Sequence, residues 1–345
     1  MRIALVALIL IGLCPCVGAK TIFVNNITGV DTNSGMLPEI AAGERGPVRS
    51  ITRALLMTTR GDKVQLADTG KPYRECVTLE GARNSGYSFA PFVLDGNGAT
   101  LDGTMPIPGV RWEFVGQNIF RFAPERGGFQ MLFLDDQPAK QMPGFHHSLL
   151  TSHLQAKEWC RCRGGIHFAV EKGKSPDNYD LSYAKERVGV TLYDVDHVVI
   201  QNLTIRGYQL DGINAHDNAM DCVISQVQAK SNGRSGISIN GASRLRLINT
   251  EAFGNAETQL RCADWSTTKV VASDFYHESL PAWTRSVNRF GRGARLFIDQ
   301  KPQTELQWWQ KSSGNLANLD GGPSPASAPT GQEADLDSEE PDDLG

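Results

Sequence analysis

The sequence lacks the short motifs that mark common catalytic sites. It contains no Gly-x-Ser-x-Gly, no His-Glu-x-x-His and no Gly-x-x-x-x-Gly-Lys-Ser/Thr pattern. It therefore gives no sign of a serine-hydrolase elbow, a zinc-protease helix or a phosphate-binding loop. Any catalytic group has to be inferred from the fold that the chain adopts.

Long apolar runs are missing after the first nineteen residues. Arg2, the apolar stretch 4–13 and the small residues 17–19 have the form of a secretory signal peptide, which predicts removal of residues 1–19. The apolar stretch is too short to cross a membrane. We therefore expect a secreted or periplasmic protein that begins near Lys20 and has no transmembrane segment.

Cysteine is scarce, which argues against a disulfide framework. The leader holds Cys14 and Cys16, and the residues before them do not form the usual small-residue lipoprotein signal. Five cysteines remain, an odd number without the spacing of a disulfide-rich domain. We expect Cys222 and Cys262 to be small buried residues. The five are Cys76, Cys160, Cys162, Cys222 and Cys262.

A strong charge of either sign is also missing from the part of the chain expected to fold. The whole chain has a net charge of −4. Arg2 is the one charge in 1–19, and 323–345 carries seven acids and no base, so the remaining residues have a net charge of +2. This near-neutral balance argues against nucleic acid as a partner. The Gly-, Pro- and acid-rich segment 323–345 is predicted to be a disordered tail.

What the sequence does contain is a repeat between residues 189 and 275. Four registered positions are separated by 23, 24 and 23 residues, and a second line of mostly amide residues is separated by 24, 23 and 24. A fixed period of this size predicts a repeat architecture. The first line is Gly189, Gly212, Gly236 and Gln259, and the second is Asn202, Gln226, Asn249 and Ser273.

Each repeat begins with a predicted strand. Alternate residues after the registered position are apolar, as in Val190, Ile213, Ile237 and Leu260, and the residues between them are mostly polar. This period of two predicts a strand with one buried face. A second strand-like run follows in each repeat without a helical pattern between them. The fold class is therefore all-β, and the register is too regular to favour a β-sandwich.

Stacked coils of this length resemble the right-handed parallel β-helix of the pectate-lyase-like superfamily. The line through Asn202 is similar to the internal amide ladder of that fold, so the resemblance implies an inward-pointing Asn202 side chain. Residues 46–81 resemble the opening of many secreted β-helix proteins. Within them, a predicted helix with Pro47 in its first turn and Gly61 as its stop would cap the solenoid core.

The domain organisation follows from where the register holds. Residues 20–103 are predicted to form the N-terminal cap and first coils, and 189–322 the later coils and a C-terminal cap. Residues 104–188 break the register and predict a β-rich insertion. The insertion is similar to an accessory β-domain of some β-helix glycosidases, including certain β-xylosidases. In those enzymes such an insertion walls one side of the substrate groove.

The insertion contains histidines and cysteines that could suggest a metal. Their spacing matches no structural zinc pattern, so no metal site is predicted and no cofactor is expected, with Ca²⁺ the exception if the protein is a lyase. The residues concerned are His146, His147, His153, Cys160, Cys162 and His167.

The chemistry is expected on the outward face of the first strand of each coil. The residues that end these strands form the column Asp194, Asp217, Gly241 and Asp264. Neighbouring coils lie roughly 4.8 Å apart. Asp194 and Asp217 should then be about 5 Å apart, and Asp217 and Asp264 about 10 Å. The first spacing suits a retaining glycosidase, and the second lies at or just beyond the upper end for an inverting one.

We therefore predict Asp217, Asp194 and Asp264 as catalytic residues. The outward neighbours on the same strands are the predicted substrate-binding residues, with Arg261 favouring an anionic sugar. They are Tyr193, Asn214, His216, Asn240 and Arg261. An aspartate at a strand end is also commonly a turn-former that bonds its own backbone, and this alternative stays open.

The function predicted is glycoside hydrolysis by a secreted, monomeric β-helix protein whose partner is a polysaccharide or oligosaccharide. The Asn-Thr-Asp, Gly-His-Gly and Arg-Ile-Lys motifs of polygalacturonases are missing. The pectate-lyase set is only faintly echoed by Asp217, Arg261 and Asp264. A polysaccharide lyase and a non-catalytic glycan-binding or envelope protein remain the alternatives.

Overall fold

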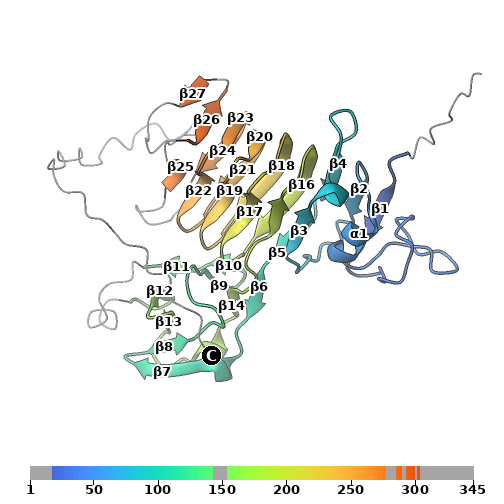
Figure 1. Ribbon diagram of the computed structural model, residues 1–345. Coiled ribbons are helices and arrows are strands. Elements are labelled where there is room, and N and C mark those ends of the chain that lie inside the picture. Colours follow the sequence, from blue (N-terminus) through green and yellow to red (C-terminus); the bar gives the residue numbers. More distant parts are fainter. Residues whose placement is uncertain (1–17, 143–153, 277–284, 290–292, 300, 304–345) are drawn as a thin grey trace, which may run out of the picture. The chain divides into compact units, whose positions relative to one another are not determined.

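The computed structural model describes residues 18–142, 154–276, 285–289, 293–299 and 301–303 (Figure 1). The predicted tail, most of the predicted leader, and His146, His147 and His153 of the possible metal cluster lie outside these residues.

Two sheets of stacked strands form the solenoid. The first strands of the coils make a parallel sheet in the order β25-β22-β19-β17-β15-β3. The predicted register is confirmed, because Val190 pairs with Ile213, Ile213 with Ile237, and Ile237 with Leu260. The strands are β3 (Val77–Glu80), β15 (Val190–Tyr193), β17 (Asp211–His216), β19 (Ser235–Ile239), β22 (Thr258–Cys262) and β25 (Arg285–Arg289).

The second strands of the coils make the other sheet, and its strands lie side by side in Figure 1. Its described pairings are parallel except that between β26 and β27. Its strands are β1 (Thr21–Val24), β2 (Lys63–Leu66), β4 (Phe92–Asp95), β5 (Thr100–Asp102), β16 (Val198–Arg206), β18 (Cys222–Lys230), β20 (Arg244–Ile248), β21 (Glu251–Phe253), β23 (Thr267–Val271), β24 (Asp274–Tyr276), β26 (Arg295–Ile298) and β27 (Lys301–Gln303).

The core is built from columns of apolar side chains that repeat once per coil. The predicted column through Ile237 is completely buried. A second column comes from the other sheet, where Ile200, Ile224 and Leu247 stack in register and are also fully buried. Cys222 and Cys262 are buried as predicted. Since each side chain packs against its equivalents one coil away, burial follows directly from the repeat.

A helix lies at the N-terminal end of the solenoid, as predicted. Helix α1 (Ile51–Met57) buries Ile51, Ala54 and Leu55 and packs against β1, β2 and β3. Its predicted start and stop were wrong. The helix begins after Ser50, whose hydroxyl accepts a hydrogen bond from the Arg53 amide at 3.1 Å.

Pro47 lies before the helix. Its carbonyl accepts hydrogen bonds from the N-terminal loop and not from an amide of the helix. The donors are Val30 N and Asn33 Nδ2, at 3.2 and 3.0 Å. Gly61 has a φ of 81° and turns the chain between α1 and β2, four residues after the helix has ended.

The predicted internal amide ladder was also wrong. Asn202, Gln226 and Asn249 have left-handed backbone, with φ of 53°, 53° and 47°. One such residue between extended neighbours bends the strand and takes its own side chain out of the inward alternation. Asn202 and Gln226 consequently line a pocket of about 390 Å³ on the outside of the solenoid.

The buried amides lie instead in the turns that lead into β19 and β22. Asn232 and Asn255 are completely buried. The Asn232 Oδ1 accepts the Tyr208 amide at 3.0 Å, and the Asn255 Oδ1 accepts the Asn232 amide and Nδ2, both at 2.9 Å. Gln259 Oε1 then accepts the Asn255 amide at 3.1 Å. These hydrogen bonds provide acceptors for backbone amides in the turns, where the sheets provide none.

Asn232→Ala tests this ladder. The substitution leaves the buried Tyr208 amide without its acceptor, so we expect the free energy of unfolding to fall by about 1–3 kcal/mol. Urea unfolding followed by circular dichroism measures it. Lys269→Ala, on an exposed position of β23, is the control, with an expected change within about 0.5 kcal/mol. Equal effects of the two substitutions would contradict a stabilising ladder.

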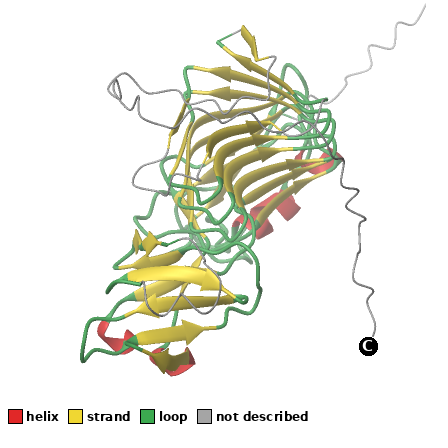
Figure 2. Ribbon diagram, turned by 90° about the vertical axis from the view of Figure 1, so that its left-hand side faces the viewer, coloured by secondary structure: helices red, strands yellow, loops and turns green. Residues whose placement is uncertain are grey.

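The insertion has its own sheets and core. Its sheets have the orders β10-β9-β14-β6 and β11-β12-β13-β8-β7, and their pairings are antiparallel except β11 with β12. Trp112, Phe122, Trp159, Phe168 and Tyr183 belong to its core. Figure 2 shows these strands as a group of their own. They are β6 (Thr104–Pro106), β7 (Trp112–Gly116), β8 (Ile119–Phe122), β9 (Leu132–Leu134), β10 (Gln137–Pro138), β11 (Lys140–Gln141), β12 (Glu158–Cys162), β13 (Gly165–Ala169) and β14 (Leu181–Ala184), and the 3₁₀ turns of the chain are η1 (Ala82–Asn84), η2 (Gly109–Arg111) and η3 (Pro176–Asn178).

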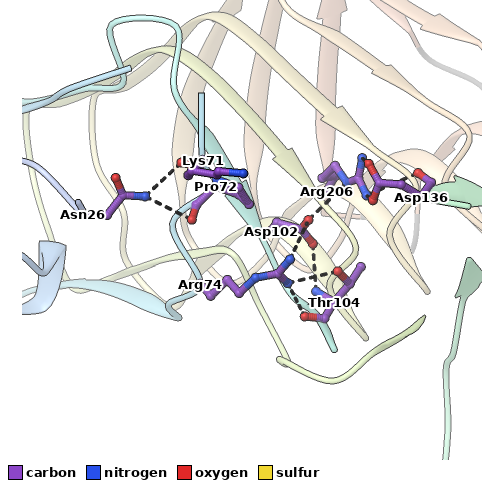
Figure 3. Close-up of polar contacts among 8 residues, drawn as sticks. All are labelled: Asn26, Lys71, Pro72, Arg74, Asp102, Thr104, Asp136 and Arg206. Carbon is purple, nitrogen blue, oxygen red and sulfur yellow. Dashed lines mark hydrogen bonds and ion pairs between the residues drawn. The ribbon is translucent and has the colours of Figure 1, made fainter. Parts of the chain in front are cut away.

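An arginine of the solenoid joins the two parts of the chain (Figure 3). Arg206, the last residue of β16, forms an ion pair with Asp136 in the β9–β10 turn, and its Nε lies 3.5 Å from Asp102 Oδ2. Asp102 also accepts the Thr104 amide at 2.8 Å, where the chain leaves the coil. In the same view, Asn26 Nδ2 donates to the carbonyls of Lys71 and Pro72.

Candidate functional site

A groove lies on the outward face of the first-strand sheet. Its volume is about 750 Å³. Five of the predicted site residues line it, and each lies on β17, β19 or β22 or just after one of these strands. They are Asn214, His216, Asn240, Arg261 and Asp264. We call this pocket the groove.

The three predicted aspartates stand at equivalent positions of their coils. Each has left-handed backbone, with φ of 49° at Asp194, 56° at Asp217 and 57° at Asp264. Aspartate, asparagine and glycine adopt this conformation at the least cost. All three therefore lie at the bends or turns that end the first strands. Asp264 Oδ2 also accepts the Gly241 amide at 2.9 Å.

Gly241 fills the place between Asp217 and Asp264 in the column. Its φ is 62°, and a Cβ there would lie 2.3 Å from the Asp217 carbonyl oxygen. No side chain fits at that distance. Glycine is thus required by the close approach of two coils as well as by the backbone conformation.

Asp217, like Asp194 and Tyr193, is not among the residues that line the groove, but it contacts His216, which is. The His216 Nδ1 lies 2.6 Å from Asp217 Oδ1, and the His216 and Tyr193 ring centroids are 6.0 Å apart. The charge of Asp217, together with a hydrogen bond to it, raises the pKa of the exposed Tyr193. A carboxylate at Nδ1 orients the imidazole and leaves Nε2 as the second functional nitrogen of His216, which lines the groove.

A chain of hydrogen bonds crosses the floor of the groove. Arg261 Nη1 donates to Asn240 Oδ1 at 2.7 Å, and Asn240 Nδ2 donates to Asn214 Oδ1 at 2.9 Å. These three residues come from three successive coils. Each hydrogen bond fixes the orientation of an asparagine side-chain amide. The groove therefore presents an ordered set of polar groups to a ligand.

Beside this chain lies a buried ion pair. Arg234 Nε donates to Asp211 Oδ1 at 3.0 Å, and the Asp211 side chain is completely buried. Burial lowers the pKa of Arg234, but its hydrogen bond to Asp211 outweighs this and leaves the pKa raised. Burial, followed by the positive charge of Arg234, lowers the pKa of Arg261. The groove thus holds two guanidinium groups close enough to repel each other.

Several residues of the groove were missed from the sequence. Arg126 comes from the insertion, Glu186 and Arg187 precede β15, and Arg234 precedes β19. Arg126 and Glu186 lie in segments without a period, whereas Arg187 and Arg234 stand two residues before the registered Gly189 and Gly236, at equivalent positions of their coils. Three consecutive charged residues, 185–187, stand shortly before the first registered strand. Burial is the largest factor that raises the pKa of Cys76, whose thiol donates to Glu186 Oε2 at 3.3 Å.

A second polar pocket of about 280 Å³ adjoins the groove and shares Arg126 and Glu186 with it. Tyr183 and Lys185 also line this pocket. The polar surface therefore continues from the coils toward the insertion.

The described residues hold no group of three or more histidine, cysteine, aspartate or glutamate side chains suited to a metal ion. In the same part of the chain, no helix is long and apolar enough to cross a membrane.

Comparison with known proteins agrees with the architecture. A family model for "Right handed beta helix region" matches residues 171–282. The solved structure "The complex structure of XylC with xylose" is similar with a TM-score of 0.53 and 12% identity. This chain folds as a right-handed parallel β-helix. The match covers 81% of this chain and 57% of XylC, so the β-helix chain spans little more than half of that protein.

Two further solved structures are similar to the β-helix chain. A protein titled "Glycoside hydrolase" has a TM-score of 0.46 and 8% identity, and the match covers 79% of this chain and 77% of that one. The "pectate lyase Pel9A" has a TM-score of 0.43 and 13% identity, with 81% and 61% covered. No curated protein sequence matches the chain. The right-handed parallel β-helix predicted from the repeat is confirmed by the stacked parallel strands and the family model.

Proposed function

We propose that the β-helix binds a carboxylated polysaccharide along the groove and hydrolyses its glycosidic bonds, with Asp217 and Asp264 as the two carboxylates. The observation that carries the proposal is the convergence of ordered polar side chains from successive coils in one pocket. From β15 to β22 there are three coil steps of roughly 4.8 Å, which give a site of roughly 14 Å. This length suits a chain of sugars more than a single one.

The charges of the groove favour an acidic sugar. Arg126, Arg187, Arg234 and Arg261 line it, together with the carboxylates Glu186 and Asp264. A sugar carboxylate placed between Arg234 and Arg261 would relieve their mutual repulsion. Arginine also binds carboxylates through two parallel hydrogen bonds. XylC, which is similar in fold, was solved with a sugar, xylose.

In the proposed reaction one carboxyl group donates its proton to the glycosidic oxygen as the bond from that oxygen to the anomeric carbon breaks. The other carboxylate takes a proton from water, whose oxygen attacks the anomeric carbon from the opposite face. Asp217 and Asp264 stand two coil steps apart, or roughly 10 Å. That separation leaves room for the water and predicts inversion at the anomeric carbon.

A second reaction is favoured by the contact between Asp217 and His216. An imidazole held by a carboxylate is a good base. In a uronic acid it could remove the proton next to the sugar carboxylate, and the bond to the departing oxygen would break. The product of this β-elimination has a carbon–carbon double bond that absorbs ultraviolet light, whereas a hydrolysis product does not.

The experiment is a panel of neutral and uronate-containing polysaccharides, assayed for new reducing ends and for ultraviolet absorbance. We expect reducing ends without absorbance on the uronate-containing members. Absorbance that appears with the reducing ends would replace hydrolysis by elimination, and its loss on addition of a calcium chelator would show that the elimination depends on Ca²⁺. Binding without either signal would support a glycan-binding protein and contradict an enzyme.

The proposal includes the setting that the sequence predicts. A polysaccharide substrate is met outside the cytoplasm, which fits the predicted leader 1–19. We propose that the enzyme acts as a monomer.

A further inference from the structure

An exposed tryptophan stands next to the groove. Trp265 follows Asp264, which lines the groove, and 77% of its surface is exposed. Burying an indole stabilises a folded protein, so a ring left in solvent loses that contribution. Trp265 therefore needs an explanation other than the packing of the core.

The indole is nonetheless held in place. The Trp265 amide donates to the Gly241 carbonyl at 3.0 Å, which fixes the turn. On the next coil Gly293 lies against the ring. A Cβ on Gly293 would lie 2.6 Å from the Asp264 carbonyl oxygen, 2.6 Å from the indole Cε3 and 2.7 Å from Cδ2. A glycine is thus the residue that lets backbone pack against this indole.

Other exposed aromatic residues have a different explanation. Phe89 is 85% exposed, but its ring stacks on Tyr87 with centroids 5.4 Å apart. Phe114 is 66% exposed and packs edge-on against Phe120 at 5.3 Å. Each of these rings stabilises a local hairpin. The Trp265 indole lies on backbone instead, beside the pocket that carries the polar groups.

We propose that Trp265 is a platform for a pyranose ring at the Asp264 end of the groove. The inference rests on the proposed function, since the sugar is a later unit of the same carboxylated polysaccharide. One face of a pyranose carries several C–H groups and is apolar, and it can stack on the electron-rich face of an indole. A rigid tryptophan loses little conformational entropy on binding, which makes it an effective contact.

The position of Trp265 makes its effect depend on ligand length. Arg126 and Glu186 come from the insertion and the loop before β15, whereas Asp264 follows β22, the strand farthest from β15 among those that line the groove. A short oligosaccharide held by the arginines inside the groove does not reach the indole. A long one extends past Asp264 and covers it.

The test measures binding of a size series of uronic-acid oligosaccharides, from disaccharide to octasaccharide, by isothermal titration calorimetry. Every protein compared, the parent included, carries Asp217→Asn, so that the oligosaccharides are not hydrolysed during the titration. We expect Trp265→Ala to weaken binding of the octasaccharide by about tenfold or more, and to leave the affinity for the disaccharide unchanged. Phe89→Ala is the matched control and should bind every oligosaccharide like the parent.

Fluorescence gives a second measurement. The parent should show a blue shift in tryptophan emission with the octasaccharide, and Trp265→Phe should lose it while remaining folded by circular dichroism. If Trp265→Ala binds the octasaccharide as tightly as the parent, the platform is refuted while the proposed function stands. If the parent binds no member of the series, both are refuted.

Discussion

Asp217→Asn is expected to reduce turnover of the carboxylated polysaccharide by about a hundredfold to ten-thousandfold. The substitution removes the charge that the proposed reaction uses and that holds His216 at 2.6 Å. It keeps the shape of the side chain, and asparagine tolerates the left-handed backbone at this position. Folding should therefore be almost unchanged. Initial rates of reducing-end release, measured beside thermal unfolding, separate the two effects.

A matched control is available in Asp221→Asn. Asp221 is also exposed and left-handed, with a φ of 51°, but it precedes β18 and lies away from the groove. We expect its turnover to stay within about twofold of the wild type, as for surface substitutions outside a site. Full activity in Asp217→Asn would refute the assignment of Asp217.

The same assay distinguishes the two possible carboxylate pairs. If Asp264→Asn loses as much turnover as Asp217→Asn, the wider pair acts. If Asp194→Asn does so and Asp264→Asn does not, the acting pair is one coil step apart, or about 5 Å. That separation would predict retention at the anomeric carbon.

Ile237→Ala should have the largest effect on stability, lowering the free energy of unfolding by about 2–5 kcal/mol. The Ile237 side chain is completely buried between Ile213 and Leu260 of the neighbouring coils. Since a solenoid coil relaxes only against its two neighbours, the cavity has little chance to close. Denaturant unfolding measures the change. Val271→Ala, at a site on β23 that is 39% exposed, should lose less, and an equal loss would contradict the register.

Much of the fold could be predicted because a β-helix repeats its contacts. One inward column, once aligned by its 23- and 24-residue steps, determines the register of a whole sheet. The same regularity led to the wrong prediction that the Asn202 side chain points inward. Periodic amides reveal that a position is equivalent in each coil, but not whether its side chain points inward. Asn232 and Asn255 repeat just as regularly, and the hydrogen bonds that distinguish them become visible only in three dimensions.

The site residues that lie on regular strands could be predicted from the sequence. Alternation along β17 and β22 placed His216 and Arg261 on the outward face, and both line the groove. Arg126 and Glu186 could not be found in this way. They reach the groove through the insertion and the loop before β15, whose paths depend on packing between segments far apart in the sequence.

Gly241 limits how the distance between Asp217 and Asp264 can change. A side chain there would collide with the Asp217 carbonyl, so substitution can delete a carboxylate from this column but cannot add one between those two. Their separation can change only by whole coils, through the gain or loss of a complete repeat. In a family of such chains, reaction geometry would vary in discrete steps, and duplication of a coil, more than point mutation, would be the route from one stereochemical outcome to another.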